Sequence, residues 1–399
     1  MLTSITVRGF KSLEQVEVPL GCVNVFIGAN GSGKSNLLEA LGFVSAVAEG
    51  RLDDQALARR GVRTSAPALY RSSFAKTQPV TETRIETRFD TPDCQLDYTL
   101  RLLMETDERE RPWPFTETRL VRDPNSQAVL YERDTGIPGM FAAPSLADGI
   151  ANQPIGDATR LRTDVLADYA VFAPNTPTLR GMEADIRQRI PVGLAGGQLA
   201  EAVQELLEPR QGKFGALDLD RLLELLDWVN EIAVVPPSRE LTSASVPTTR
   251  SIIRFTDRWM GRDRNQLSAY DASEGALYVL FALVLALHPH SPRLFAIENL
   301  DQNMHPRLAR ATVRLFCELM LKAEPERQVL LTTHNPLVLD SLNLRDDRIR
   351  LFTVERDVEG TTRVDRVPVS DEMLRVIENG LSLSNLWVMG RLGGVPDLF

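Results

Sequence analysis

The sequence predicts an α/β fold with a mixed sheet, an antiparallel β subdomain and a helical insertion. Three observations predict it. A glycine-rich segment near the N-terminus lies between an apolar strand pattern and a helical pattern. Alternating apolar and polar residues between residues 83 and 131 are typical of antiparallel strands. After residue 290 the chain returns to apolar strand patterns that end in polar residues.

Composition excludes several classes of protein. The 399 residues are 43% hydrophobic and 25% charged, which is ordinary for a folded protein of one elaborated domain or up to three modules. No apolar run approaches the roughly 20 residues of a membrane-spanning helix, and the first residues lack a signal-peptide pattern. We therefore expect a soluble, cytoplasmic protein without membrane contact. The formal net charge of -9 gives no overall attraction to nucleic acid, although a local basic patch stays open.

The first elements form a strand-rich opening. Residues 5–7 and 16–18 alternate apolar and polar side chains on either side of a turn at residues 9–12, which predicts two short strands. A mostly apolar, β-branched run at residues 22–27 predicts a third strand. Leucines and a valine at helical spacing predict a helix over residues 36–48.

A phosphate-binding motif lies between the third strand and this helix. Residues 28–35 read GANGSGKS and fit G-x-x-x-x-G-K-[ST] in the strand-loop-helix setting that a P-loop requires. Its glycines let backbone N–H groups curl around a phosphate at the helix N-terminus. Lys34 is expected to contact the β- and γ-phosphates of ATP, and the Ser35 hydroxyl to ligate Mg²⁺. The expected nucleotide-binding residues are Asn30, Gly31, Ser32, Gly33, Lys34, Ser35 and Asn36.

Residues 5–41 resemble the opening of ABC-type ATPases related to SMC, RecF and the OLD-type (overcoming lysogenization defect) defence proteins. The shared features include the Phe10-Lys11-Ser12 turn and Asn36 after the P-loop serine. The resemblance implies a P-loop NTPase of the ABC/SMC-head type and predicts a signature serine, a Walker B acid and a switch histidine toward the C-terminus. Transporter ATPases usually differ here, so a transporter subunit is the least favoured function.

The segment at residues 267–275 resembles the Ser-acid-Gly form of the ABC signature and precedes a long apolar helix. The resemblance implies that Ser273 and Gly275 reach the γ-phosphate held by a second subunit, which makes ATP the contact of a head-to-head dimer. The alternative is an ordinary helix N-cap, in which the Ser273 hydroxyl binds the first turn.

Residues 293–299 form an apolar strand pattern ending in an acid and resemble Walker B, with the His-Pro pair at residues 305–306 downstream. The resemblance implies that Glu298 holds Mg²⁺ together with Ser35, while Asn299 replaces the glutamate that polarises water in relatives. A general base contributes roughly 10²- to 10⁴-fold to rate, so we expect slow hydrolysis with Asn299 only orienting water. Asp301 is the alternative base.

A strand pattern at residues 328–333 ends in Thr-His and resembles the segment that carries the switch histidine of the family. His334 would then sense the γ-phosphate, as a third catalytic residue beside Glu298 and Asn299. The alternative is an ordinary polar residue at a strand end. Its order after the P-loop, signature and Walker B segments favours the functional role.

The expected organisation is one composite ATPase domain. Residues 1–140 form the N-terminal lobe with the P-loop and antiparallel strands, residues 141–240 a mainly helical insertion, and residues 241–399 the C-terminal lobe. Helices are expected at residues 199–207 and 217–229. No sustained heptads occur, which excludes a long coiled coil. Two arginine clusters are interpreted as solvated surface rather than phosphate contacts, namely residues 57–63 and Arg307, Arg310 and Arg314.

The resemblance implies a homodimer or higher homo-oligomer with ATP between its heads, which regulates an effector in bacterial anti-phage defence. No acidic cluster of the Toprim nuclease type follows the ATPase segments, so the effector, a nuclease or toxin, is expected from a neighbouring gene. Two alternatives stay open. One is a RecF-like ATPase that closes on DNA. The other is a hydrolysis-poor scaffold that binds ATP structurally, as Asn299 suggests.

Overall fold

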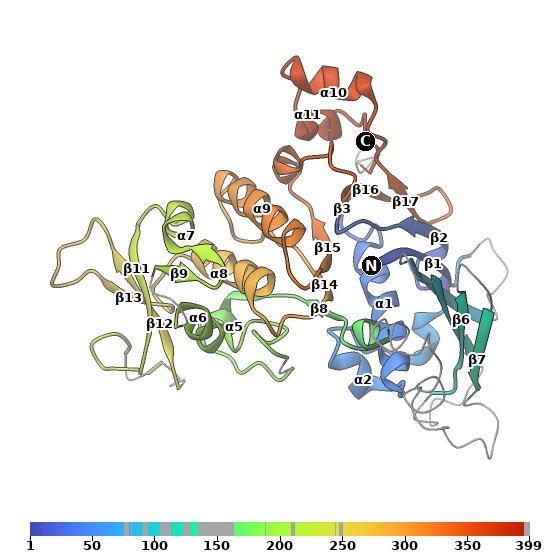
Figure 1. Ribbon diagram of the computed structural model, residues 1–399, viewed down its shortest axis with the longest axis horizontal. Coiled ribbons are helices and arrows are strands. Elements are labelled where there is room, and N and C mark those ends of the chain that lie inside the picture. The colour runs from blue at the N-terminus through green and yellow to red at the C-terminus, as the bar shows by residue number, and fades with distance from the viewer. Residues whose placement is uncertain are drawn as a thin grey trace.

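The computed structural model describes residues 1–75, 80, 82–90, 95–103, 113–122, 128–134, 163–187, 189–208, 212–243, 245–246 and 250–394. A six-stranded central sheet has the order β17-β16-β3-β15-β14-β8 (Figure 1). Its strands are β3 (Val23–Ile27), β8 (Ala170–Phe172), β14 (Leu294–Ile297), β15 (Gln328–Thr333), β16 (Ile349–Arg356) and β17 (Thr362–Arg366). All pairings are parallel except that of β17, which makes the sheet mixed as predicted.

The central strand β3 pairs with both halves of the chain. Val23 lies opposite Val329 of β15 on one side and Ile349 of β16 on the other. Every residue of β3, β14 and β15 is buried, which is why these strands are continuous apolar runs rather than alternating ones. Parallel strands end at a common edge, so the segments that follow β3, β14 and β15 meet there.

Helices cover both faces of this sheet and give two hydrophobic cores (Figure 1). Phe26 packs toward α1 (Lys34–Glu49), and its neighbours Val25 and Ile27 pack toward the opposite core. That core holds α8 (Glu274–Leu287) and α9 (Pro306–Leu321). The remaining elements around the sheet are α2 (Asp54–Ala58), η1 (Pro67–Tyr70), η2 (Pro336–Ser341), α10 (Asp371–Glu378) and α11 (Leu383–Val388).

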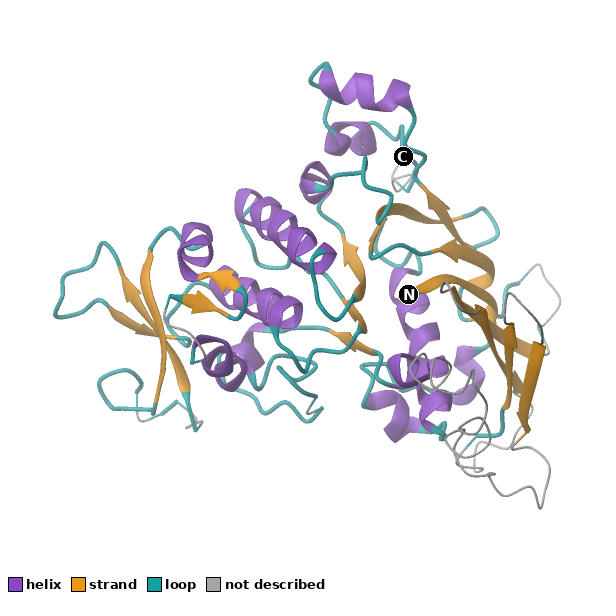
Figure 2. Cartoon of the chain, in the orientation of Figure 1, coloured by secondary structure: helices purple, strands orange, loops and turns teal. Residues whose placement is uncertain are grey.

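The predicted antiparallel subdomain is a second six-stranded sheet, ordered β2-β1-β4-β5-β6-β7. Figure 2 shows it beside the helices around α1. Alternate residues of β1 and β4 are buried, as the sequence alternation requires. The strands are β1 (Leu2–Phe10), β2 (Leu13–Pro19), β4 (Glu82–Asp90), β5 (Gln95–Leu103), β6 (Thr116–Arg122) and β7 (Ala128–Asp134).

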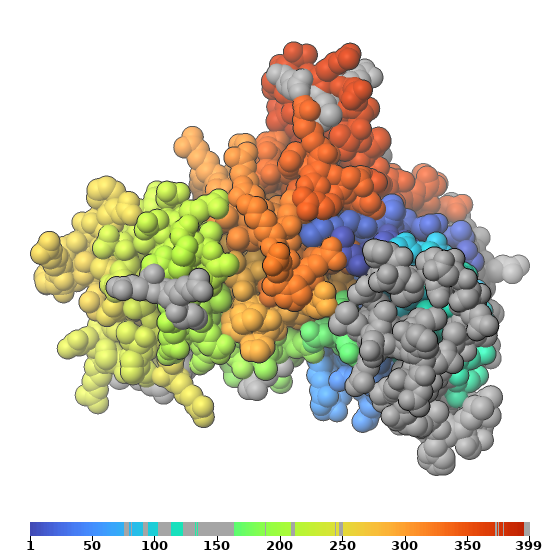
Figure 3. Space-filling model, viewed as in Figure 1, coloured from blue at the N-terminus to red at the C-terminus, as the bar shows by residue number. Residues whose placement is uncertain are grey.

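The segment predicted as a mainly helical insertion contains strands as well as helices. Residues 141–162 lie outside the described residues. The rest contributes β8 to the central sheet and β11 to a three-stranded sheet at the left of Figure 1, where its residues form the yellow and yellow-green side of the surface in Figure 3. Its elements and continuation are α5 (Thr176–Leu179), α6 (Leu199–Leu207), β9 (Lys213–Phe214), β10 (Leu217–Asp218), α7 (Leu219–Leu225), β11 (Val229–Val235), β12 (Ile252–Asp257) and β13 (Gln266–Ser268).

The helix expected at residues 217–229 is shorter than predicted. Its first two residues pair with β9, and its last residues turn into β11, so the helix runs only from Leu219 to Leu225. The helix expected at residues 199–207 is confirmed as α6. Among the described residues, no helix has the length and apolar character that crossing a membrane requires.

Candidate nucleotide-binding site

The P-loop follows β3 in a conformation that glycine alone suits. Gly31 and Gly33 have positive φ angles of 76° and 111°. A Cβ atom at Gly28 would lie 2.0 Å from the carbonyl oxygen of Val354, and one at Gly33 would lie 2.2 Å from Thr362 Oγ1. The loop is therefore held tightly against the β16–β17 hairpin, with its backbone free to face a phosphate.

The Phe-Lys-Ser turn between β1 and β2 stabilises this loop through hydrogen bonds. Ser12 Oγ accepts a hydrogen bond of 2.7 Å from Asn36 Nδ2, and Thr362 Oγ1 lies 2.7 Å from both Ser12 Oγ and the Ser32 carbonyl. Lys11 forms an ion pair with Glu39 on α1. The side chain of Asn36 is thus engaged in holding the loop, and its direct role in nucleotide binding stays a prediction.

Lys34 begins α1 with its ammonium group beside the loop. Its Nζ donates hydrogen bonds of 2.8 Å to the carbonyls of Gly28 and Ala29. Burial lowers the pKa of Lys34 to about 8, and the nearby Glu298 carboxylate opposes this shift. A phosphate at this position would restore the charged form of the ammonium group.

Glu298 follows β14 at the same sheet edge. Its N–H donates to the Phe172 carbonyl of β8 at 2.9 Å, and its charge acts on Lys34 and on His334. With the Ser35 hydroxyl it supplies oxygen ligands of the kind that Mg²⁺ prefers. The described residues contain no cluster of three or more His, Cys, Asp or Glu that could hold a metal.

Asn299 occupies a strained backbone position. Its φ angle of 50° lies in the left-handed region, which asparagine tolerates better than most residues. Its N–H donates to Thr332 Oγ1 of β15 at 3.0 Å. The asparagine therefore suits the turn that it occupies, which is a structural reason for an asparagine at this position.

Asp301 brings a second carboxylate to the site. Hydrogen bonds from the Thr333 and Asn335 side chains and the nearby charge of His334 lower its pKa, but burial outweighs them and raises it overall. A carboxylate beside the end of β15 can accept a proton, and a raised pKa makes it a stronger base. Asp301 therefore stays the predicted alternative base.

His334 lies at the end of β15 and contacts the P-loop across the sheet edge. Its Nδ1 is 3.1 Å from the Gly28 carbonyl oxygen and 3.4 Å from Lys34 Nζ. Burial and the charge of Lys34 lower the pKa of His334, so its imidazole is neutral at pH 7. The structure therefore brings together Lys34, Glu298 and His334 from distant parts of the sequence.

The segment that resembles the ABC signature lies at the start of α8. Ser273 occupies the N-cap position, but its side chain makes no capping hydrogen bond and is exposed. The expectation that its hydroxyl caps the helix is therefore wrong. Gly275 is buried, and a Cβ atom there would lie 3.1 Å from Leu308 of α9. Among the described residues, Ser273 makes no side-chain hydrogen bond that would give it a role within its own chain.

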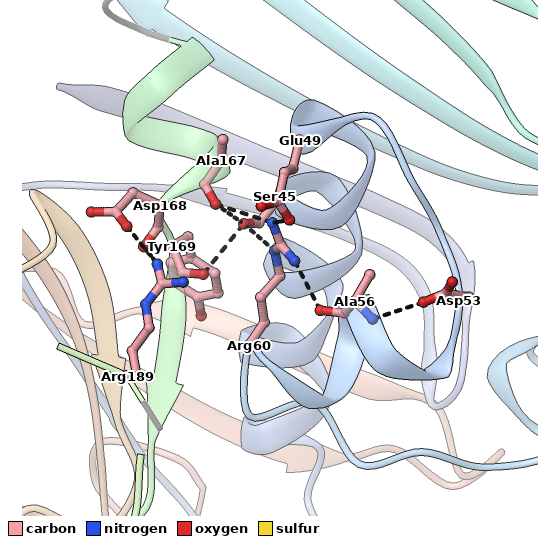
Figure 4. Close-up of polar contacts among 9 residues, drawn as sticks. All are labelled: Ser45, Glu49, Asp53, Ala56, Arg60, Ala167, Asp168, Tyr169 and Arg189. Atoms are coloured by element: carbon pink, nitrogen blue, oxygen red, sulfur yellow. Dashed lines mark hydrogen bonds and ion pairs between the residues drawn. The ribbon is translucent and has the colours of Figure 1, made fainter. Parts of the chain in front are cut away.

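The basic cluster at residues 57–63 is neither a phosphate site nor a solvated patch at its centre. Arg60 is almost fully buried. Figure 4 shows its guanidinium donating to Ser45 Oγ at 2.6 Å, to the Ala56 carbonyl at 2.8 Å and to Glu49 at 2.8 Å. It also bonds the Ala167 carbonyl at 3.1 Å, which ties α1 to the segment before β8.

Two arginines at the P-loop escaped sequence interpretation. Arg356 Nε donates to the Gly31 carbonyl at 2.9 Å, and Arg63 pairs with Glu39 at 2.5 Å with its Nη2 3.4 Å from Asn36. Nothing in the sequence around Arg356 indicates its contact with the P-loop, because that contact depends on the pairing of β16 with β3. Arg63 belonged to the basic cluster, but the sequence could not show that it turns toward α1.

Comparisons with known proteins agree with this geometry. Residues 1–89 match a family model described as "AAA ATPase domain", and residues 183–340 match one described as "AAA domain, putative AbiEii toxin, Type IV TA system". The chain is 23% identical to the OLD nuclease of Thermus scotoductus over 417 residues, which is 100% of this chain and 68% of that protein.

A solved structure shows the fold. The SMC head bound to the C-winged helix domain of ScpA superimposes with a TM-score of 0.54 at 12% identity, covering 94% of this chain and 99% of that one. The P-loop, the SMC-head fold and the two ATPase family matches together support an ABC/SMC-like ATPase with weak similarity to the OLD nuclease.

Proposed function

We propose that the chain binds ATP with Mg²⁺ at its P-loop, closes around it with a second copy, and thereby controls an effector protein in bacterial anti-phage defence. The observation that carries nucleotide binding is the convergence of Lys34, Glu298 and His334 on one sheet edge. The metal would neutralise phosphate charge between Ser35 and Glu298. Lys34 would exchange its two carbonyl bonds for phosphate oxygens.

Hydrolysis is proposed to be slow because the carboxylate of relatives is an amide here. Asn299 can orient a water molecule but cannot take its proton. Asp301, half-buried and hydrogen-bonded to the Thr333 and Asn335 side chains, is the remaining acceptor. Neutral His334 can share a hydrogen bond with the γ-phosphate without adding charge to the crowded ammonium of Lys34.

Dimerisation is supported by the exposed Ser273 at the N-terminus of α8. A helix N-terminus favours an anion, and the hydroxyl of this serine has no capping partner in its own helix. We expect MgATP, but not MgADP, to convert the purified protein to dimers or higher oligomers in size-exclusion chromatography with light scattering. Ser273→Arg should abolish this conversion while leaving ATP binding intact, and an ATP-independent oligomer would contradict the proposal.

The defence role is supported by two names. One relative is called OLD nuclease, and the family model for residues 183–340 mentions a toxin. A RecF-like DNA-binding role ranks lower, because arginines on the open face of the antiparallel sheet are largely neutralised. Arg88 and Arg122 both pair with Asp97, at 2.7 and 2.6 Å. Salt-sensitive binding of duplex DNA would favour that role.

A hydrolysis-poor scaffold is the remaining candidate, and Asn299 is the observation that favours it. Steady-state ATP turnover separates the regulator from the scaffold. A regulator must hydrolyse ATP to leave its ATP-bound state, whereas a scaffold can keep its ATP. Turnover that cannot be detected at saturating ATP would favour the scaffold.

A further inference from the structure

A cationic groove lies between α7 and α9, away from the residues that converge on the P-loop. Its volume is about 540 Å³, and its walls carry Arg221 from α7 and Arg307, Arg310 and Arg314 from α9. Figure 1 shows the two helices next to each other. We propose that this groove binds an acidic amphipathic segment of a partner protein, and that this binding changes ATP turnover at the nucleotide site.

The α9 arginines form a row on one face of the helix. Positions three and seven apart share a helix face, so the row from Arg307 to Arg314 is about 10 Å long. All three side chains are exposed, and within the described part of the chain they form no ion pair or side-chain hydrogen bond. Like charges at this spacing repel each other. In a chain with a net charge of -9, such an unpaired row is suited to carboxylates from outside.

The groove is less suited to a nucleic-acid backbone. Arg221 already pairs with Glu318 at 3.1 Å, and Glu224 also lines the groove. A continuous row of phosphates would be repelled by both carboxylates. The lining also includes Leu225 and Leu315, which offer apolar contacts that phosphates do not use. Separated positive sites with apolar surface between them match a protein segment whose acidic and apolar side chains alternate.

Two of the elements that line the groove, α9 and η2, begin directly after loops that carry proposed catalytic residues. α9 begins at Pro306, immediately after the loop that carries Asn299 and Asp301. η2 begins at Pro336, two residues after His334, and Ser341 at its end lines the groove. A segment bound in the groove would contact both α9 and η2, and would therefore shift the positions of Asp301 and His334 together. This coupling, unlike the docking itself, rests on the proposed function.

Docking is tested with a fluorescein-labelled helical peptide of about 18 residues that repeats glutamate and leucine at helical spacing. Fluorescence anisotropy should show salt-sensitive binding to the full chain, weakened about tenfold or more by Arg310→Glu with Arg314→Glu. The matched control reverses two exposed arginines in the β12–β13 loop, Arg262→Glu with Arg264→Glu, and should change affinity less than about twofold.

A second comparison leaves the protein unchanged, in case the groove variant does not fold. Replacing the glutamates of the peptide by glutamines should weaken binding to the wild-type chain about tenfold. Equal binding of both peptides, or no binding of the acidic one, would overturn the proposal. So would single-stranded DNA that binds more tightly than the peptide and loses its affinity in the groove variant.

The coupling between peptide binding and the ATP site is measured separately from peptide binding itself. The acidic peptide should change ATP turnover of the wild-type chain at least about twofold and leave the turnover of the groove variant unchanged. If the peptide binds but calorimetry detects no MgATP binding, the proposed function fails and the docking site stands. If MgATP binds and the peptide does not, the docking proposal alone fails.

Discussion

The two halves of the nucleotide site differ in how completely the chain equips them. The phosphate-holding half has glycines at the required φ angles, the buried ammonium of Lys34, and support from Ser12 and Thr362. The proposed hydrolytic half has the acid Glu298 but carries the amide Asn299 where the family resemblance predicts a glutamate. The chain is therefore better equipped to bind ATP than to hydrolyse it. We expect ATP to bind quickly and to be hydrolysed slowly, so that the ATP-bound state is long-lived.

The largest effect should come from the phosphate-holding half. Lys34→Ala removes a desolvated ammonium and its charge-assisted hydrogen bonds, each worth about 1.5–3 kcal/mol. We expect MgATP affinity to fall about 10²- to 10³-fold in isothermal titration calorimetry. Lys322→Ala, an exposed lysine at the end of α9, is the control and should bind normally. Unchanged affinity of Lys34→Ala would remove the basis of the whole interpretation.

The next effect tests the hydrolytic half directly. If Asp301 is the remaining proton acceptor, Asp301→Asn should lower ATP turnover about 10²-fold with MgATP affinity nearly unchanged. A coupled phosphate-release assay measures the rate, and calorimetry measures the affinity. Asp263→Asn on the exposed β12–β13 loop is the matched control. A loss of affinity as large as the loss of rate would mean that Asp301 holds the loop rather than accepting the proton.

A gain of function should sharpen the same contrast. Asn299→Glu restores a carboxylate, and we expect turnover to rise about tenfold, less than a full general base provides because glutamate is strained at a φ angle of 50°. Asn299→Gln has the same length without the charge and should not raise turnover. Fast wild-type turnover that Asn299→Glu leaves unchanged would show that the asparagine imposes no limit.

The smallest expected effect is the uptake of a proton by Lys34 when MgATP binds. Because burial lowers the pKa of Lys34 to about 8, roughly nine tenths of this group is neutral at pH 9 in the free protein. Phosphate favours the charged form, so its pKa should rise on binding. Calorimetry in buffers of different ionisation enthalpy should show uptake of about 0.9 proton per MgATP at pH 9 and only about 0.1 from this group at pH 7. Absence of uptake at pH 9 would mean that Lys34 stays charged throughout.

Sequence reasoning was most successful where a few neighbouring residues determine the structure. The P-loop, the hairpin before it and the antiparallel strands depend on local periodicity and glycine spacing, and the structure confirms them. It was weaker where the fold acts over distance. Arg60 looked like a surface charge, because nothing in its own segment shows that Ser45 and Ala167 accept its hydrogen bonds. The left-handed turn at Asn299 was likewise invisible without the pairing of β14 with β15.

The central position of β3 also has a consequence for synthesis. The ribosome releases this strand early, but its partners β15 and β16 emerge only when residues 328–356 have been made. For most of translation, the strand before the P-loop has neither of its hydrogen-bonding neighbours, and such distant pairings form slowly. A chain interrupted before residue 328 would keep an intact GANGSGKS motif and lack the sheet edge that turns this motif into a binding site.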